Sequence, residues 1–235
     1  QTWGDVRLNE RFADKVLMPG FDEGHAHVME GSLWRKVYCG WFDRADPDGK
    51  RWSGVKTVDA VVARLQAAEA ALEDPAAAVS GWQLDPIYMD NTTLTRADLD
   101  RVSTTRAVGV LHASGHIMNV NTKALELAGM LKTGHNHPGI PLGADGLPTG
   151  ELKGPEVMTP VGPFVGFERN LLDADEAGLR NFAKLCVRTG TTPLTDLASP
   201  MDGDTVDMLL RVPNEPPYTL RPLPLTSFPR PSPPA

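Results

Sequence analysis

Two histidines in the sequence, His25 and His27, have the spacing of a metal site. They lie in the segment Pro19-Gly20-Phe21-Asp22-Glu23-Gly24-His25-Ala26-His27. If this segment ends a strand, both imidazoles point to the same side, because side chains alternate with a period of two. Two neutral imidazoles on one face are the usual start of a zinc-type site, which needs further ligands and an open position for water. The spacing therefore predicts a metal site, and a pair of surface histidines is the alternative.

The other four histidines give weaker signals. His135 and His137 have the same spacing but lie in turn-rich sequence before Pro138, which favours ordinary loop polarity. His112 and His116 have the i, i+4 spacing of helical ligands. A helical metal pair is rejected, because Ala113-Ser114-Gly115 separates them after an apparent strand and the glutamate of a zincin helix is missing. A histidine just past a strand end can still orient a substrate.

Other catalytic patterns are absent from the sequence. There is no phosphate-binding P-loop, and Ser114 lacks the preceding glycine of a nucleophile elbow. Cys39 and Cys186 have no local pattern that would lower a thiol pKa. Trp82 is interpreted as either a core anchor or the wall of a pocket.

Composition restricts the class of protein. The 235 residues carry a formal net charge of -7 and two cysteines. This charge argues against a nucleic-acid binder, which shows a concentrated basic face. Two cysteines exclude a disulfide scaffold and fit a reducing compartment. No apolar run reaches the ~20 residues of a membrane span, and no basic-then-apolar leader is present. We therefore expect a cytoplasmic protein without membrane or nucleic-acid partners.

The chain divides into a folded part, residues 1–210, and a proline-rich tail, residues 211–235. Nine of the 24 residues from Val212 to Ala235 are proline, against 12 in the preceding 211. Because proline lacks an N–H and fixes φ, we expect this tail to be extended, unpaired and disordered.

Strands and helices alternate along the folded part. Helices are predicted over 57–74, from Thr95, from Asn121 to a left-handed Gly129, and from Asp173 to Gly190. Strands are predicted over 15–18, 107–111 and 191–197. This alternation is typical of a parallel sheet with crossover helices, which is an α/β fold. We expect the three strands to lie side by side in one sheet, with His25 and Asp196 at the same edge.

Together, several segments resemble the family-3 amidohydrolases, which include N-substituted formamide deformylases. Six blocks carry the resemblance in the same order: Val16 to His27, Gly81 to Pro86, Leu94 to Val102, His116 to Leu125, Asp145 to Gly150, and Gly190 to Thr192 with Asp196. The similarity spans about residues 15–200.

The resemblance implies a (β/α)8 TIM barrel with the metal at the carboxyl ends of its strands. A divalent metal, zinc in one or two copies, would activate water for attack on a non-peptide amide or related carbon–nitrogen bond. His25 and His27 match the family's paired metal ligands. Lys153 lies where a carboxylated lysine could bridge two metals, with Glu151 as a rival ligand. Trp82, His116 and Asn121 are predicted to bind a small amide-type substrate.

The sequence also departs from the family pattern. Glu23 replaces the usual Asp before the histidines, and Thr195 replaces a His. No histidine follows His137, so later histidine ligands and a proton-shuttling aspartate are missing, and no catalytic residue is assigned. The resemblance therefore implies a partial barrel that lacks the C-terminal strands and the family's β-sandwich. We expect such a truncated chain to be nearly inactive and to self-associate through unpaired sheet edges.

Two other functions remain open. The chain could be a non-catalytic half-barrel, or a hydrolase of the same superfamily that acts on a phosphoester or lactone, because a metal hydroxide is not selective by itself.

Overall fold

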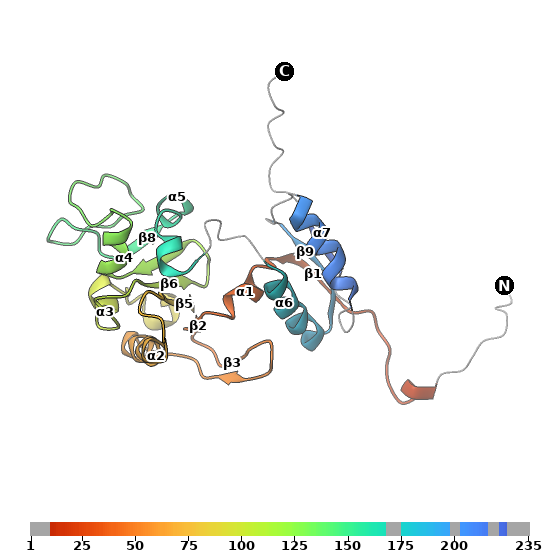
Figure 1. Cartoon of the computed structure of the whole chain (residues 1–235). Coiled ribbons are helices and arrows are strands. Elements are labelled where there is room, and N and C mark those ends of the chain that lie inside the picture. Colours follow the sequence, from red (N-terminus) through yellow and green to blue (C-terminus); the bar gives the residue numbers. More distant parts are fainter. Residues whose placement is uncertain (1–9, 168–174, 198–202, 216–220, 225–235) are drawn as a thin grey trace, which may run out of the picture.

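The computed structural model describes residues 10–167, 175–197, 203–215 and 221–224. Within them the chain forms a mixed α/β fold with one five-stranded, one three-stranded and one two-stranded sheet. Figure 1 shows the two larger sheets in different parts of the molecule, with α1 and α6 between them. The strands are β1 (Phe21–Ala26), β2 (Val37–Tyr38), β3 (Arg44–Ala45), β4 (Arg51–Trp52), β5 (Val79–Leu84), β6 (Val108–His112), β7 (Ile117–Val120), β8 (Glu151–Lys153), β9 (Thr191–Asp196) and β10 (Arg221–Pro224). The helices are α1 (Glu30–Leu33), α2 (Val58–Ala70), α3 (Arg96–Asp100), α4 (Thr122–Leu127), α5 (Pro155–Met158), α6 (Glu176–Thr189) and α7 (Gly203–Arg211), with 3-10 turns η1 (Glu10–Phe12), η2 (Pro86–Met89), η3 (Gly162–Val165) and η4 (Val212–Asn214).

The five-stranded sheet has the order β2-β5-β6-β7-β8. Strands β2, β5 and β6 are parallel, whereas β7 pairs antiparallel with both β6 and β8. Buried apolar side chains fill both of its faces: one group includes Leu111, Met118 and Leu152, and the other includes Val62, Leu65 and Leu99 from α2 and α3. A sheet covered on both faces explains why Val108, Val110 and Leu111 of β6 are all buried and apolar.

Side-chain caps begin helices α2, α3 and α4, close to the predicted starts. Thr57 accepts a hydrogen bond from the Ala60 N–H at the start of α2. Thr95 and Asp98 form a reciprocal capping box on α3. Asn121 caps α4, and Gly129 has φ of +67°, the left-handed conformation predicted for it.

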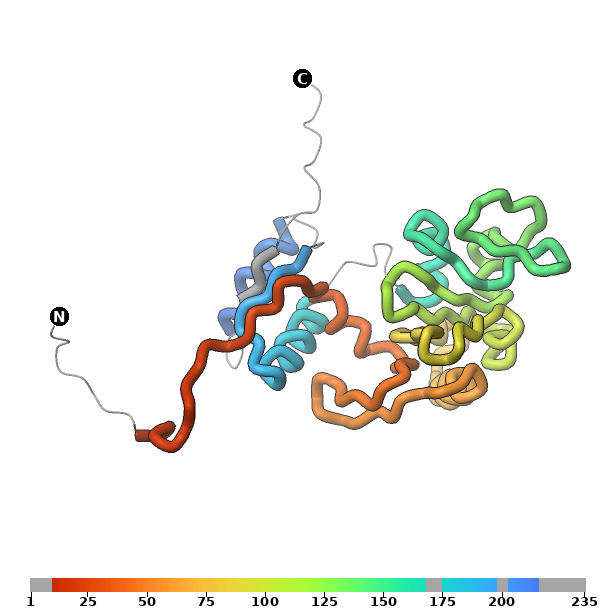
Figure 2. Tube along the Cα trace, turned by 180° about the vertical axis from the view of Figure 1, so that it is seen from behind, coloured from red at the N-terminus to blue at the C-terminus, as the bar shows by residue number. Residues whose placement is uncertain are grey.

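The three-stranded sheet has the order β1-β9-β10, and all three strands are parallel. Figure 2 shows the red N-terminal strand lying along the blue C-terminal segment. Helices α6 and α7 bury Leu179, Ala183 and Leu209 against Leu194. Asp175 caps α6, and Gly190 ends it with φ of +75°. The predicted cap, Asp173, lies outside the described residues.

The structure corrects the predicted strand arrangement. Residues 15–18 are not a strand, and Val16 is 92% exposed; β1 begins after Gly20, where pairing with β9 starts at Thr191. Strands β6 and β9 belong to different sheets, so the expected single sheet is wrong. A strand has two edges, and both edges of β6 are occupied, by β5 and by β7.

The prediction of an unpaired tail is also wrong in part. Arg221–Pro224 pairs with β9 as an edge strand, a position where proline is tolerated because the outer edge needs no N–H. Val212 is fully buried with Leu209 and Leu194. The remaining tail residues, 216–220 and 225–235, lie outside the described ranges.

Glycines hold α1 against α6, and this contact places the end of β1. A Cβ on Gly31 would lie 1.9 Å from the Gly178 carbonyl oxygen, which is backbone and cannot rotate away. We therefore expect Gly31→Ala to destabilise the fold by about 1–3 kcal/mol, the usual cost of overpacking. Urea unfolding measures this change. Gly24→Ala is the matched control, because nothing lies within 4 Å of its Cβ position, and an equal loss in both variants would contradict the close-packing explanation.

Among the helices of the described ranges, none has the length and apolar character needed to cross a bilayer.

Candidate active site

The predicted histidine pair lies at the carboxyl end of β1. His25 is exposed, His27 is half-buried, and the intervening Ala26 is buried, so the two imidazoles share one side of the chain as the spacing predicted. Their ring centroids are 5.2 Å apart, and the rings are nearly perpendicular.

Asp196 lies beside this pair, at the end of the neighbouring strand β9. The parallel register places it opposite Ala26. Asp196 is 2% exposed; its Oδ2 accepts a hydrogen bond of 2.9 Å from the Val28 N–H, and its Oδ1 lies 3.6 Å from His27 Nδ1. This confirms that His25 and Asp196 lie at the same edge of a sheet. The carboxylate fixes the backbone after the histidines and places a negative charge behind the His27 ring.

The donor types at this edge fit a divalent metal, but they do not complete a metal site. His27 Nδ1 is buried and has no hydrogen-bond partner among the described residues. The Asp196 carboxylate beside it is of the type that fixes the orientation of metal-binding histidines. Catalytic zinc usually takes three protein ligands. No group of three or more His, Cys, Asp or Glu side chains with metal-binding geometry occurs within the described part of the chain.

Two clefts open near the carboxyl ends of the strands. The first, here called the His27 cleft, has a volume of about 120 Å³; its walls include His27, Glu30, Leu33, Trp82, His112 and His116. Burial raises the pKa of Glu30 in this cleft. The second, here called the Lys153 cleft, has about 640 Å³; its walls include Asp85, Asn91, His112, Ser114, Glu151 and Lys153. His112 belongs to both clefts.

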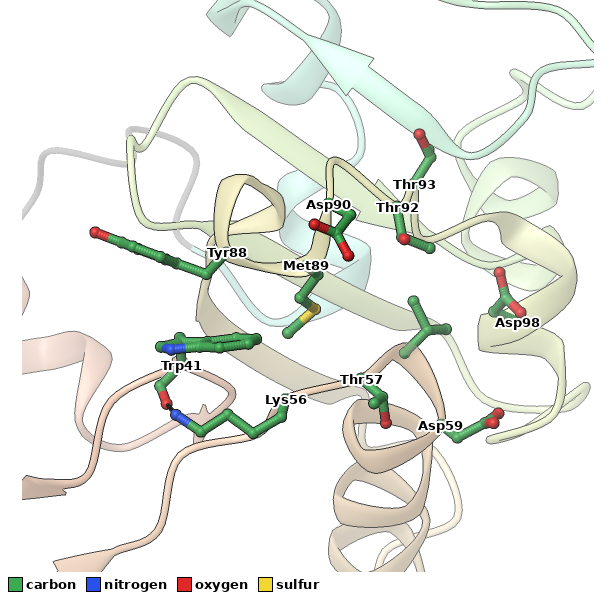
Figure 3. Close-up of a pocket in the computed structure, with 11 residues that line it drawn as sticks. Trp41, Lys56, Thr57, Asp59, Tyr88, Met89, Asp90, Thr92, Thr93 and Asp98 are labelled. Atoms are coloured by element: carbon green, nitrogen blue, oxygen red, sulfur yellow. Dashed lines mark hydrogen bonds between the residues drawn. The ribbon is translucent and has the colours of Figure 1, made fainter.

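A third cleft of about 430 Å³ lies at the start of α2 and contains none of the predicted site residues. Figure 3 shows Trp41 and Tyr88 stacked at one end of it and Asp59 and Asp98 at the other. Both aspartates also lie within ion-pair distance of Arg101.

The predicted substrate residues have different environments. Trp82 is 1% exposed; it packs edge-on against Trp34 and Tyr38 and also lines the His27 cleft, so it is both a core residue and a cleft wall. His116 is exposed at the rim of the same cleft.

Asn121 is fully buried, and backbone groups surround its side-chain amide. Its Oδ1 accepts from the Val108 and Ala124 N–H groups, and its Nδ2 donates to the Ser103 and Arg106 carbonyl oxygens. These four hydrogen bonds use the full capacity of the amide. Asn121 therefore joins β6 and α4 to the segment between α3 and β6.

Lys153 is placed apart from the histidine pair. Its Nζ lies 2.6 Å from Glu151 Oε1, so the two candidates for one ligand position form an ion pair with each other. They line the Lys153 cleft, whereas His27 lines the other cleft.

Sequence reasoning missed the pairing of His112 with Asn119. His112 Nε2 is hydrogen-bonded to Asn119 Oδ1, and Asn119 is fully buried on β7. The available signal was a polar residue within an apolar strand, but the β6–β7 hairpin that brings the two together was not predicted.

The cysteines are structural, as their sequence context indicated. Burial raises the pKa of the Cys39 thiol to about 12 and that of Cys186 to about 11. Both therefore remain protonated near neutral pH, unlike reactive thiolates.

Two solved structures resemble this chain in fold. An uncharacterized metal-dependent hydrolase from Pyrococcus horikoshii OT3 aligns with a TM-score of 0.52 and 14% identity, over 88% of this chain and 36% of that one. A second, from Pyrococcus furiosus, aligns with a TM-score of 0.50 and 14% identity, over 89% of this chain and 38% of that one. At this identity the likeness concerns the fold. The chain spans little more than a third of the length of these structures.

The profile of the amidohydrolase family matches residues 13–214. The chain therefore belongs to the amidohydrolase family. No curated protein matches the sequence.

Proposed function

We propose that the protein is a metal-dependent hydrolase of carbon–nitrogen bonds other than peptide bonds, with His25 and His27 as metal ligands. The observation that carries this proposal is the convergence of the two imidazoles and the buried Asp196 carboxylate at adjacent ends of β1 and β9. The proposed fold context is part of a (β/α)8 barrel, whose active sites lie at the carboxyl ends of the strands. The family match supports the hydrolase class.

In this proposal each residue of the chain has a defined task. Asp196 holds the turn after β1 through the Val28 N–H and orients the His27 ring, leaving its outer nitrogen to bind metal. When bound, a zinc ion would supply an activated water and polarise the substrate carbonyl. Trp82 and His116, at the wall and rim of the His27 cleft, would contact the substrate. Lys153 would serve as a further metal ligand only after its ion pair with Glu151 is broken.

Asp196→Asn and Asp196→Ala separate these tasks. Both variants remove the charge behind His27, and we expect each to weaken zinc binding by about 10–100-fold, as is typical of partners that orient metal-bound histidines. Only Asp196→Ala also removes the acceptor for the Val28 N–H, which should cost about 1–3 kcal/mol in unfolding free energy. Competition titration with a zinc chelator and urea unfolding measure the two effects.

The exposed carboxylate Asp59 supplies the control, because Asp59→Asn removes the same charge at a different site. Unchanged zinc affinity in both Asp196 variants would remove this residue from the metal site.

Hydrolysis assays distinguish the proposed function from its alternatives. The chain and its His25→Ala/His27→Ala variant would be incubated with added zinc and matched panels of amides, lactones and phosphoesters. We expect amides to be the preferred substrates, at a low rate because the described residues lack a three-ligand cluster, and the double variant to abolish this turnover. Preference for phosphoesters or lactones would change the substrate class. Metal binding without any turnover would support a non-catalytic half-barrel.

A further inference from the structure

A buried hydrogen-bond chain connects the end of β6 with the segment before α3. His112, the last residue of β6, is 7% exposed, and its Nε2 is hydrogen-bonded to Asn119 Oδ1 on β7. The other end of the same amide, Asn119 Nδ2, donates to the Leu94 carbonyl oxygen at 2.6 Å. Asn119 itself is fully buried.

These two hydrogen bonds determine which nitrogen of His112 carries the proton. A backbone carbonyl can only accept, so the Asn119 group that faces Leu94 must be the NH2. The amide oxygen then faces His112, and it too can only accept. His112 Nε2 must therefore be the donor, which makes Nδ1 the unprotonated nitrogen of the neutral ring.

The lone pair on Nδ1 is available to a ligand. Within the described residues, no group is hydrogen-bonded to Nδ1. The atom is nevertheless not buried without a partner, so it remains accessible from the clefts. His112 lines both the His27 cleft and the Lys153 cleft. Burial lowers the pKa of His112, outweighing the opposite effects of its bond to Asn119 and of the Glu151 and Asp85 charges, while Lys153 acts in the same direction as burial.

We propose that His112 Nδ1 accepts a hydrogen bond from an N–H group of an amide ligand bound in the clefts, and that Asn119 is the positioning residue that keeps this nitrogen unprotonated. The amide class of the ligand rests on the proposed function. The proposal adds a recognition element for the nitrogen side of the bond, separate from the metal ligands on β1.

The tautomer is tested first, without any ligand. Nitrogen-15 labelling of the six histidines, with long-range proton–nitrogen correlation spectra, distinguishes Nε2–H from Nδ1–H rings. The His112 signal is assigned by elimination: it is the one that remains when each of the other histidines is substituted in turn. We expect a pure Nε2–H ring in the protein and a mixture of the two neutral forms in Asn119→Leu, which removes the accepting oxygen. An Nδ1–H ring in the unaltered protein overturns the proposal, whether or not the Leu variant folds.

A second experiment, with acetamide and N,N-dimethylacetamide, tests whether His112 Nδ1 accepts a hydrogen bond from a ligand N–H group. These two amides share the carbonyl, but only acetamide has N–H groups. We expect acetamide to shift the His112 Nδ1 resonance several-fold more than dimethylacetamide does, and this difference to shrink in Asn119→Leu. Equal shifts from both amides overturn the proposal. The same spectra recorded on metal-free protein keep the two proposals apart, because this response requires no zinc: a difference between the two amides would support the recognition element even if the metal assignment fails.

Discussion

Replacing His25 and His27 together with alanine should abolish binding of zinc by the protein. The two imidazoles lie on one side of the chain with ring centroids 5.2 Å apart, and no three-ligand cluster elsewhere in the described residues could replace them. Zinc content after dialysis measures the effect. Affinity should be poor even in the unaltered chain, because two imidazoles leave a catalytic site short of its usual three protein ligands.

The sequence offers a matched control with the same spacing. His135 and His137 form a second His-x-His pair, but His135 Nε2 is within hydrogen-bond distance of the Met130 carbonyl, and His137 Nδ1 accepts from the Gly139 N–H. His135→Ala/His137→Ala should therefore leave zinc binding unchanged. Equal zinc content in the His25/His27 variant and the parent would refute the metal assignment.

Trp82→Ala should destabilise the protein by about 3–5 kcal/mol, the usual cost of deleting a buried aromatic side chain. Trp82 is 1% exposed and packs against Trp34 and Tyr38 at centroid distances of 5.1 and 5.8 Å. The midpoint and slope of urea unfolding give the change in free energy.

Phe42→Ala is the control for this prediction, because Phe42 is 55% exposed and should cost less than about 1 kcal/mol. A similarly small loss for Trp82→Ala would show that Trp82 serves as a cleft wall rather than a core anchor. Trp82→Phe keeps most of the buried volume and should recover part of the stability.

Helix starts were predictable because they depend on residues that are close in sequence. Thr57, Thr95 and Asn121 each cap the helix that they precede, through hydrogen bonds to an N–H three residues later. The hydrogen bond between the capping oxygen and a free N–H of the first turn is local, so it does not depend on how the rest of the chain folds. The shared side of His25 and His27 follows from strand periodicity in the same way.

Strand pairing was less predictable because it joins distant residues. Nothing local to residues 107–111 indicates that the next strand returns as a hairpin, and β7 occupies the edge that the predicted single sheet required. Similarly, proline content argued against pairing in the tail, but the outer position next to β9 tolerates it in Arg221–Pro224.

The candidate site shows the same division between local and distant interactions. The residue types and spacing in β1 indicated a metal pair, and the register of β1 with β9 then supplied Asp196 from 168 positions beyond Val28. The four backbone partners of Asn121 could not be predicted from the sequence, because folding brings β6, α4 and the segment between α3 and β6 together around it. The protonation of His112 depends on Asn119 and, through it, on the Leu94 carbonyl. Side-chain chemistry is thus a property of each residue, whereas its partners depend on which strand edges and helix ends the folded chain brings together.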